Sequence, residues 1–223
     1  MAYIFNYYSS ANSSNTIIAE STPYDSIYNN ILIGSRYNDT IYGESGANLF
    51  NEMHGLRGND TFYGGSGSGT YNVYVGGAGI DTAVIPSASG NVSMSIDYQG
   101  GVVFTRADGG HDQVNSEVEI IQFSGGNKFF NVSAGIDDEA TVSNQFAWHS
   151  GDRLVISNDW LAALNAGSVG ISIIDVNRDG VLDTVLNGYN GTNSYTLLNY
   201  NLNAHPNAHV VGVYGEGILY DLA

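Results

Sequence analysis

The chain has 223 residues, of which 22 are acidic and 6 are basic, and its formal net charge is −16. This excess of negative charge argues against nucleic acid and anionic membranes as partners and favours cations, of which metal ions are the simplest. The absence of cysteine excludes disulfides, zinc–thiolate sites and thiol catalysis.

The first ten residues contain neither a basic region nor a long apolar run, so we expect no Sec signal peptide there. No stretch approaches the roughly 18 apolar residues that a membrane-spanning helix needs, and no membrane insertion is expected. The 29 glycines and 3 prolines are set among many Tyr, Val, Ile, Thr and Asn residues. This composition predicts an all-β fold of short strands and tight turns.

A repeat with a constant offset of 21 residues is the strongest pattern in the chain. Residues 34–46 (GSRYNDTIYGESG) return as residues 55–67 (GLRGNDTFYGGSG), and a third copy begins at Gly76 (GGAGIDT). Each copy contains one aspartate at the same position, and these evenly spaced residues are Asp39, Asp60 and Asp81.

Each 21-residue unit divides into a nine-residue step and a twelve-residue step, because Asn48 and Gly69 lie nine residues after Asp39 and Asp60. Two steps make one turn of a flattened coil, so loops two steps apart stack about 4.8 Å apart on one edge. The aspartates should share that edge, and Asn48 and Gly69 should lie on the opposite one. The inward apolar residues of the intervening strands would be Ile41, Phe62 and Ala83.

Stacked carboxylates repel one another unless cations bridge them, and Ca²⁺ takes six to eight oxygen ligands from carboxylates and backbone carbonyls. Glycine permits the left-handed backbone that turns carbonyls inward. We therefore expect the aspartate edge to hold two calcium ions, one in each gap, and the opposite edge to be poor in metal. The alternative is ordinary turn chemistry that recurs by chance.

Residues 76–84 (GGAGIDTAV) closely resemble the hemolysin-type calcium-binding (RTX) repeat, Gly-Gly-x-Gly-x-Asp-x-U-x, where U is a large apolar residue. The resemblance implies a parallel β-roll whose ions are held by the aspartates and by backbone carbonyls. Carried over position by position, the carbonyl ligands would be those of Gly34, Arg36, Gly55, Leu56, Arg57, Gly58, Gly77 and Gly79.

The resemblance continues downstream, where residues 110–123 (GHDQVNSEVEIIQF) match the motif that closes such rolls. A β-hairpin of residues 92–97 and 102–106, around a turn at 98–101, would precede it. We predict four regions: an N-terminal cap at 1–32, the roll at 33–85, a hairpin extension at 86–130 and a C-terminal, mostly-β region at 131–223.

A second candidate calcium loop occupies residues 175–183 (DVNRDGVLD). Its oxygen-bearing side chains follow the spacing of an EF-hand loop, but Leu186 stands where the final glutamate would be, so a complete EF-hand is excluded. The flanks, 171–174 and 184–186, read as strands. The loop resembles the shorter Asp-x-Asp-x-Asp-Gly-x-x-Asp type, which implies as ligands Asp175, Asn177, Asp179, Asp183 and the carbonyl of Val181. The alternative is an acidic hairpin turn without metal.

The best helix candidate is residues 159–166, with Ser157 or Asn158 as its N-terminal cap and Gly167 at its end. Trp148, His149, Asp152 and Trp160 could form a sugar-binding surface, although a packed corner of the core is favoured.

Catalytic motifs are absent from the sequence: it contains no His-Glu-x-x-His, Gly-x-Ser-x-Gly or Walker pattern. His205 and His209 are separated by Pro206, which argues against a helix that would align them. The acidic run at 137–139 is interpreted as a solvated turn. We therefore expect no enzymatic activity.

The interpretation is an extracellular calcium-binding structural protein that folds on calcium and self-assembles or adheres, as a surface-layer, matrix or filament component. The resemblance implies type I secretion with an uncleaved C-terminal signal, and residues 179–223 contain no Lys or Arg. One alternative is a protein that binds or degrades cell-surface polysaccharide, with the repeat as an accessory module. A calcium-dependent toxin is weakened by the lack of an amphipathic apolar segment.

Overall fold

The computed structural model describes residues 3–8, 13–19, 28–97, 101–132, 143–147, 151–187, 194–198, 201–204 and 209–221. The chain forms two compact units, residues 1–95 with 101–127 and residues 96–100 with 128–223. Within the described residues, none of the helices is both long enough and apolar enough to cross a membrane.

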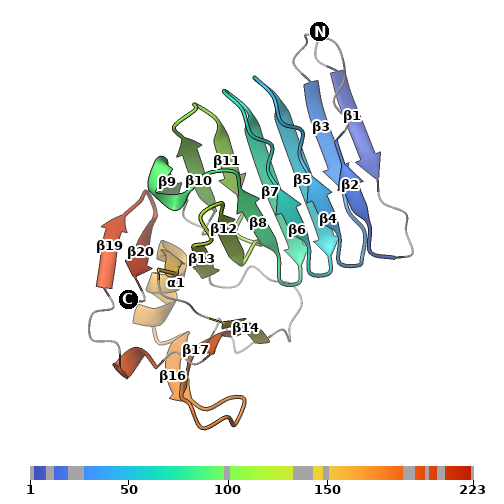
Figure 1. Ribbon diagram of the computed structural model, residues 1–223. Helices are drawn as coiled ribbons and strands as arrows, with labels where there is room; N and C mark the ends of the chain where they lie inside the picture. Colours follow the sequence, from blue (N-terminus) through green and yellow to red (C-terminus); the bar gives the residue numbers. More distant parts are fainter. Residues whose placement is uncertain are drawn as a thin grey trace. The chain divides into compact units, whose positions relative to one another are not determined.

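The first unit is a coil of two sheets, in which successive strands from β1 to β8 alternate between one sheet and the other (Figure 1). One sheet contains, in spatial order, β1 (Tyr3–Tyr8), β3 (Tyr28–Ile33), β5 (Phe50–Arg57), β7 (Tyr71–Ala78), β11 (His111–Val114), β10 (Val102–Arg106) and β9 (Val92–Ile96). The other contains β2 (Thr16–Ile18), β4 (Thr40–Tyr42), β6 (Thr61–Tyr63), β8 (Thr82–Ile85) and β12 (Ile120–Phe123).

The 21-residue repeat sets the strand register. Parallel pairing aligns Ile41 with Phe62 and Phe62 with Ala83 in one sheet. In the other sheet, β3, β5 and β7 pair in the same way with the same offset. One repeat unit is therefore one turn of the coil, and the predicted parallel β-roll is confirmed. Both sheets continue towards the N-terminus, because β1 pairs with β3 and β2 pairs with β4, also in parallel.

The core lies between the two sheets because residues alternate in and out along each strand. The predicted inward residues Ile41, Phe62 and Ala83 are fully buried. From the facing sheet, Leu32, Met53 and Tyr74 are equally buried. Phe62 meets Tyr74 edge-on, with ring centroids 6.2 Å apart. Each large buried side chain contributes about 1.5–3 kcal/mol to folding.

The roll closes through a hairpin. Strands β9 and β10 occupy the places predicted for it, and residues 98–100 of the predicted turn lie outside the described residues. A short 3-10 helix, Ser89–Asn91, leads into β9. After β10, β11 pairs antiparallel with β10 and parallel with β7. Strand β12 then pairs parallel with β8, so the chain rejoins both sheets after the hairpin.

A ladder of buried amides runs through the sheet of β3, β5, β7 and β11, one residue to each strand. Asn30 Nδ2 donates to Asn51 Oδ1 (3.0 Å), Asn51 Nδ2 to Asn72 Oδ1 (2.9 Å) and Asn72 Nδ2 to Asp112 Oδ1 (2.7 Å). Asn51 also bonds the backbone N–H and C=O of Glu44, and Asn72 those of Gly65. These amides thereby fix the turns opposite the aspartate edge.

A buried ion pair ends the amide ladder. Arg106 Nη1 donates to Asp112 Oδ2 at 2.6 Å, and both side chains are almost fully buried. Arg106 Nη2 also donates to the carbonyls of Gly67 and Thr70 in the neighbouring turn. Burial opposes the charge of Arg106, but Asp112 and Asp108 outweigh it and raise the pKa of the guanidinium. The edge opposite the aspartates therefore has a positive charge of its own, the guanidinium of Arg106.

The second unit contains two groups of strands and a helix. One group contains β13 (Lys128–Val132), β15 (Arg153–Ser157), β20 (Gly217–Asp221) and β19 (His209–Val213), in that spatial order. The other is a four-stranded sheet of β14 (Ser143–Ala147), β18 (Ser194–Leu198), β17 (Asp183–Asn187) and β16 (Gly170–Ile174). A 3-10 helix spans Leu202–Ala204.

The helix α1 (Asn158–Asn165) follows β15 and confirms the predicted helix to within a residue at each end. Ser157 is its N-terminal cap residue, and Asp159 lies in the first turn, where a negative charge is favourable. After Ala166, Gly167 adopts φ +71°, and Ser168 N–H donates to the Ala163 carbonyl. This left-handed glycine ends the helix as the sequence predicts.

Candidate metal centre

Three buried aspartates form a ladder on one edge of the roll, each directly before a strand. Asp39, Asp60 and Asp81 precede β4, β6 and β8, and none is more than 1% exposed. Asp39 N–H donates to Asp60 Oδ1 (2.6 Å), and Asp60 N–H donates to Asp81 Oδ1 (2.8 Å). The predicted stacking of the three acidic side chains on one edge is therefore present, and one oxygen of each is tied to the backbone.

The ladder has a rung at each end that the sequence analysis missed. At the start, Asn15 N–H donates to Asp39 Oδ1 (2.7 Å). At the far end, Asp81 N–H donates to Glu119 Oε2 (2.8 Å), because β12 pairs with β8 in the register of the earlier turns. Glu119 is 38 residues from Asp81, since the closing hairpin interrupts the period.

The loops that precede β4, β6 and β8 are called here the first, second and third loop; they begin at Gly34, Gly55 and Gly76. Oxygen atoms converge beside the first glycine of the first two loops. A Cβ atom added to Gly55 would come closer than 3.0 Å to both Asp60 Oδ2 and the Gly76 carbonyl oxygen. The same crowding occurs at Gly34, from Asp39 Oδ2 and the Gly55 carbonyl. A carboxylate oxygen of one turn and a carbonyl oxygen of the next thus face the same point. Such a set of hard oxygen donors fits Ca²⁺.

Asp60 carries the clearest electrostatic sign of a cation-binding site. Its Oδ2 atom is buried and has no hydrogen-bond partner. Burial raises the pKa of the Asp60 carboxyl to about 7; the hydrogen bond from the Asp39 backbone lowers it, and the negative charge of Asp39 raises it further. A buried carboxylate remains ionised at low cost only when a positive charge accompanies it.

The three loops are not equivalent. In the second loop Leu56 and Gly58 have φ values of +79° and +109°, and their counterparts in the third, Gly77 and Gly79, have +97° and +146°. The first loop has Ser35 and Tyr37 at these positions, and neither has a positive φ.

Ser35 changes the environment of the first aspartate. Its backbone N–H and its hydroxyl both donate to Asp39 Oδ2, at 2.6 and 2.8 Å. Asp39 therefore already has donors for both carboxylate oxygens, whereas Asp60 Oδ2 has none. The gap between the second and third loops, flanked by Asp60 and Asp81, is the better candidate for an ion.

Backbone carbonyls have to complete any site on this edge. Among the described residues, no three His, Asp or Glu side chains gather where they could hold one metal ion. The predicted carbonyl ligands all lie in the three loops: Gly34 and Arg36 in the first, Gly55, Leu56, Arg57 and Gly58 in the second, and Gly77 and Gly79 in the third. Their role as ligands stays a prediction.

The second candidate loop, residues 175–183, joins β16 and β17 in an antiparallel hairpin, so the strand flanks are as predicted. Its side-chain oxygens turn inward onto the loop backbone. Asp175 accepts from Asp179 N–H (3.1 Å) and from Gly180 N–H (3.0 Å), and Asn177 Oδ1 accepts from Asp179 N–H (3.1 Å).

The inward turn of this loop depends on two residues with left-handed backbone, Arg178 (φ +61°) and Gly180 (φ +89°). At its end, Asp183 is fully buried, and its Oδ2 accepts from Val176 N–H at 2.8 Å. The four predicted side-chain ligands thus belong to one compact loop, while calcium binding by them and by the Val181 carbonyl stays a prediction.

Other residues singled out in the sequence fall into two groups. Asp152 and Trp160 are 3% and 2% exposed, as expected of a packed corner and not of a sugar-binding surface. Trp148, His149, His205 and the acidic run at 137–139 lie outside the described residues.

Comparisons with known proteins identify the repeat. A family model of the RTX calcium-binding nonapeptide repeat, with four copies of the repeat, matches residues 24–51 and 50–71. A comparison with curated protein sequences finds no match to the chain. Among solved structures, the chain is similar to the crystal structure of the extracellular lipase LipA from Serratia marcescens, with 15% identity and a TM-score of 0.37. That match covers 83% of this chain and 39% of the lipase chain.

Proposed function

Because this chain is an RTX repeat protein whose repeats bind Ca²⁺, we propose that it is a secreted structural protein that folds on external calcium and then self-assembles or adheres. The observation that carries the proposal is Asp60: a buried carboxylate with an unbonded oxygen and a pKa raised to about 7 is only partly ionised at neutral pH, and a bound cation would stabilise its ionised form.

The proposed main site lies between the second and third loops. Asp60 and Asp81 supply carboxylate oxygens, and the carbonyls of Gly55, Arg57, Gly77 and Gly79 supply the remainder. The equivalent site between the first and second loops uses Asp39, Gly34, Arg36, Leu56 and Gly58. We expect it to bind more weakly, because Ser35 occupies Asp39 Oδ2 and has to give way to the ion.

Calcium binding at this edge would be coupled to folding, because the loops that supply the ligands are brought together only in the coil. External calcium near the millimolar range, with a Kd of roughly 10⁻⁴ M as in extracellular modules, stabilises the fold by on the order of 1.4 kcal/mol per site. Several sites together can decide whether a marginally stable chain is folded.

The loop of residues 175–183 is proposed as a further calcium site, with Asp175, Asn177, Asp179 and Asp183 as side-chain ligands and Val181 as the carbonyl ligand. Support comes from the inward-facing oxygens and the buried Asp183. Asp179→Asn should remove one bound ion in calorimetric titration. A Glu216→Gln variant, which loses the same charge outside both candidate sites, should retain every ion.

Secretion and assembly are supported by weaker observations. The lack of cysteine and the lack of Lys and Arg in residues 179–223 agree with export followed by folding outside the cell. The spatial order of the roll's sheets places β1 and β2 at sheet edges. Unpaired strand edges are surfaces on which a second copy can add its own strands.

Calcium titration followed by circular dichroism and light scattering tests the proposal in one experiment. We expect β-structure and its melting temperature to increase as calcium is added, scattering to rise afterwards and EGTA to reverse these changes. A chain that is equally folded after exhaustive chelation would contradict calcium-dependent folding. Folded monomers at every calcium concentration would contradict self-assembly and leave adhesion to be tested with surfaces.

Polysaccharide binding is a second candidate because aromatic rings stack on the outside of the roll. The rings of Tyr42 and Tyr63 are 4.6 Å apart and nearly parallel, and Phe50 and Tyr71 stack at 5.8 Å. Tyr63 is exposed and the other three rings are half-buried, so these stacks offer apolar surface to sugar rings. Binding on a glycan array that is lost in Tyr63→Ala would favour this function, and no binding to any glycan would contradict it.

A further inference from the structure

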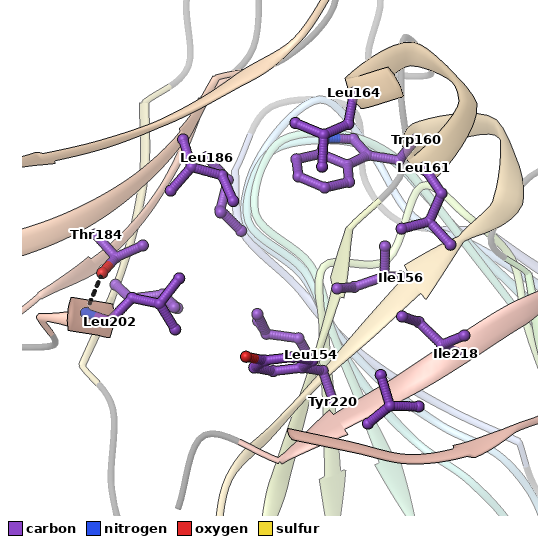
Figure 2. A pocket seen from close by; sticks show the side chains of 13 residues that line it. Leu154, Ile156, Trp160, Leu161, Leu164, Thr184, Leu186, Leu202, Ile218 and Tyr220 are labelled. Carbon is purple, nitrogen blue, oxygen red and sulfur yellow. Dashed lines mark hydrogen bonds between the residues drawn. The ribbon is translucent and has the colours of Figure 1, made fainter. Parts of the chain in front are cut away.

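The second unit contains an apolar cavity that the calcium sites do not use. It has a volume of about 190 Å³ and lies between the helix α1, strands of both groups and the 3-10 helix at 202–204. Figure 2 shows Trp160 and Leu161 from α1, Leu186 from β17 and Tyr220 from β20 around the same open space. The cavity is partly open, and Val210 of β19, which is 47% exposed, lines it as well.

The lining determines the chemistry of a ligand. All thirteen lining residues are uncharged, and ten of them are Leu, Ile or Val. An ion that enters such a space loses its hydration without gaining a partner. The net charge of −16 adds a long-range penalty for anions. The occupant is therefore neutral and consists mainly of hydrocarbon.

Size gives a second limit. A dry cavity of about 150 Å³ lined by Leu, Ile and Phe holds one benzene molecule. By that measure, about 190 Å³ accommodates a six-carbon ring or chain with one small substituent.

One polar group in the wall has no partner of its own. Figure 2 shows the hydroxyl oxygen of Tyr220 directed into the open space, and this hydroxyl makes no hydrogen bond within the part of the chain that the structure describes. The Thr184 hydroxyl, in contrast, already accepts from Leu202 N–H at 3.0 Å. Unsatisfied donors next to a cavity favour an occupant with an oxygen acceptor.

We propose that this cavity is a binding site for a small neutral molecule of about six to eight carbons that carries one oxygen, such as an alcohol, a ketone or an ester. Its hydrocarbon part packs against the side chains of α1, β15 and β17. Its oxygen accepts a hydrogen bond from the Tyr220 hydroxyl, which is directed into the open space in Figure 2.

Nuclear magnetic resonance of the full chain with calcium present provides the test, because the protein has only two tryptophans and thus two indole N–H signals. Trp160→Phe assigns them by removing one signal. Titration with 1-hexanol should shift the Trp160 signal in a saturable manner. Hexanoate, of the same chain length but charged at neutral pH, should leave it in place.

Two pairs of variants connect the shift to the cavity. Val210→Trp fills the rim and should abolish the hexanol shift, whereas Val213→Trp, on the same strand but 74% exposed and outside the cavity lining, should preserve it. Tyr220→Phe removes only the hydroxyl and should weaken binding by about three- to tenfold, the effect of one hydrogen bond. Thermal denaturation of each variant verifies that it is folded.

Any one of three results would overturn the proposal: no saturable shift with hexanol, an equal shift with hexanoate, or unchanged binding in Val210→Trp. These measurements are made at a calcium and protein concentration at which light scattering detects no assembly, so the failure of this site and of the proposed function can be told apart.

Discussion

At the scale of single residues, Asp60 is the aspartate whose buried charge is least compensated within the roll. Both Asp39 and Asp60 are buried at the same edge, but Ser35 solvates Asp39 Oδ2 with two donors while Asp60 Oδ2 has no partner. The second loop has no hydroxyl at the equivalent position, where Leu56 instead adopts a left-handed backbone (φ +79°). The protein thus leaves one carboxylate oxygen for an external cation.

Replacing Asp60 separates calcium binding from metal-free stability. Asp60→Asn keeps the acceptor for the Asp39 N–H and removes the buried charge, so the metal-free roll should be at least as stable as the original. Calcium affinity should fall by about tenfold or more, as for the loss of a charged ligand from a buried site. Calorimetric titration and thermal denaturation, with and without EGTA, measure both effects.

Glu52→Gln is the matched control for Asp60→Asn, because it removes the same charge from β5 while Glu52 contacts His54 and not the loops. It should leave calcium affinity unchanged. An Asp60→Asn protein that binds calcium as tightly as the original would remove Asp60 from the site.

The raised pKa of Asp60 predicts how metal-free stability depends on pH. In the unfolded chain this carboxyl loses its proton near pH 4, but in the metal-free fold it does so near pH 7. The folded state therefore binds more protons between these values, and stability falls as pH rises through the window. In calcium-free buffer, after calcium has been removed by dialysis, we expect a higher melting temperature at about pH 5 than at about pH 8. Calcium should remove most of this difference, and Asp60→Asn should show less of it.

The sequence analysis missed Glu119 and Ser35 for two different reasons. Glu119 takes the fourth acidic rung, yet it does not follow the 21-residue period, because the hairpin of β9 and β10 intervenes. A local signal was present: Glu119-Ile-Ile121 repeats the acid–x–apolar order of Asp39-Thr-Ile41. The role of Ser35 could not be predicted, because its hydroxyl meets Asp39 only in the folded loop.

At the scale of elements, two polar ladders of different chemistry hold the turns of the roll in register. One is acidic and incomplete without cations. The other, formed by Asn30, Asn51, Asn72 and Asp112, satisfies its members within the protein and ends on the Arg106 guanidinium. A one-residue slip would break both ladders at once and would expose the core face of every strand.

Removing one amide should therefore cost stability without affecting the metal sites. Asn51→Ala breaks bonds to Asn30 and Asn72 and leaves the Glu44 N–H and C=O without their partner. We expect a loss of about 2–4 kcal/mol in the free energy of unfolding, because several buried groups lose their partners. Urea denaturation in saturating calcium measures it. Asn127→Ala, at an exposed site, should change little, and a loss below about 1 kcal/mol in Asn51→Ala would contradict the ladder's role.

The strands of the roll show which structural features a sequence pattern is sufficient to predict. The 21-residue offset predicts parallel strands, their register and the buried column of Ile41, Phe62 and Ala83, because spacing alone determines which residues align. The amides Asn30, Asn51 and Asn72 follow the same offset, but an isolated asparagine in a strand does not disclose whether it faces the core or solvent. Burial of a polar ladder depends on the opposite turns, which only the three-dimensional structure brings into contact.

At the scale of the whole molecule, the net charge and bound calcium have opposite effects on the stability of the folded state. A formal charge of −16 on 223 residues opposes any compact state, and assembly of several copies multiplies the repulsion. Calcium lowers this charge, but bridging of buried carboxylates is a local effect that general screening does not reproduce. The two contributions can be distinguished with a monovalent salt.

Sodium chloride should stabilise the calcium-free protein only modestly. It screens exposed charges over a Debye length of about 10 Å at 0.1 M, but it does not reach the buried Asp60 and Asp81. Melting curves in EGTA with increasing sodium chloride should rise slightly and remain below the calcium-bound value. Full recovery of the calcium-bound melting temperature by sodium chloride alone would show that screening, and not ion bridging, stabilises the roll.

The strict register of the coil also means that its length can change by whole turns. Excising residues 34–54 would bring Gly55 directly after Ile33, in the place where Gly34 stood, and Asp60 would then receive the Asn15 N–H in place of Asp39. Every remaining strand would pair in parallel with a strand from the adjacent turn, in the register that it has now. Tandem duplication of that segment would lengthen the protein equally smoothly, so genetic gain or loss of one repeat can produce a size series of folded variants with both ends intact.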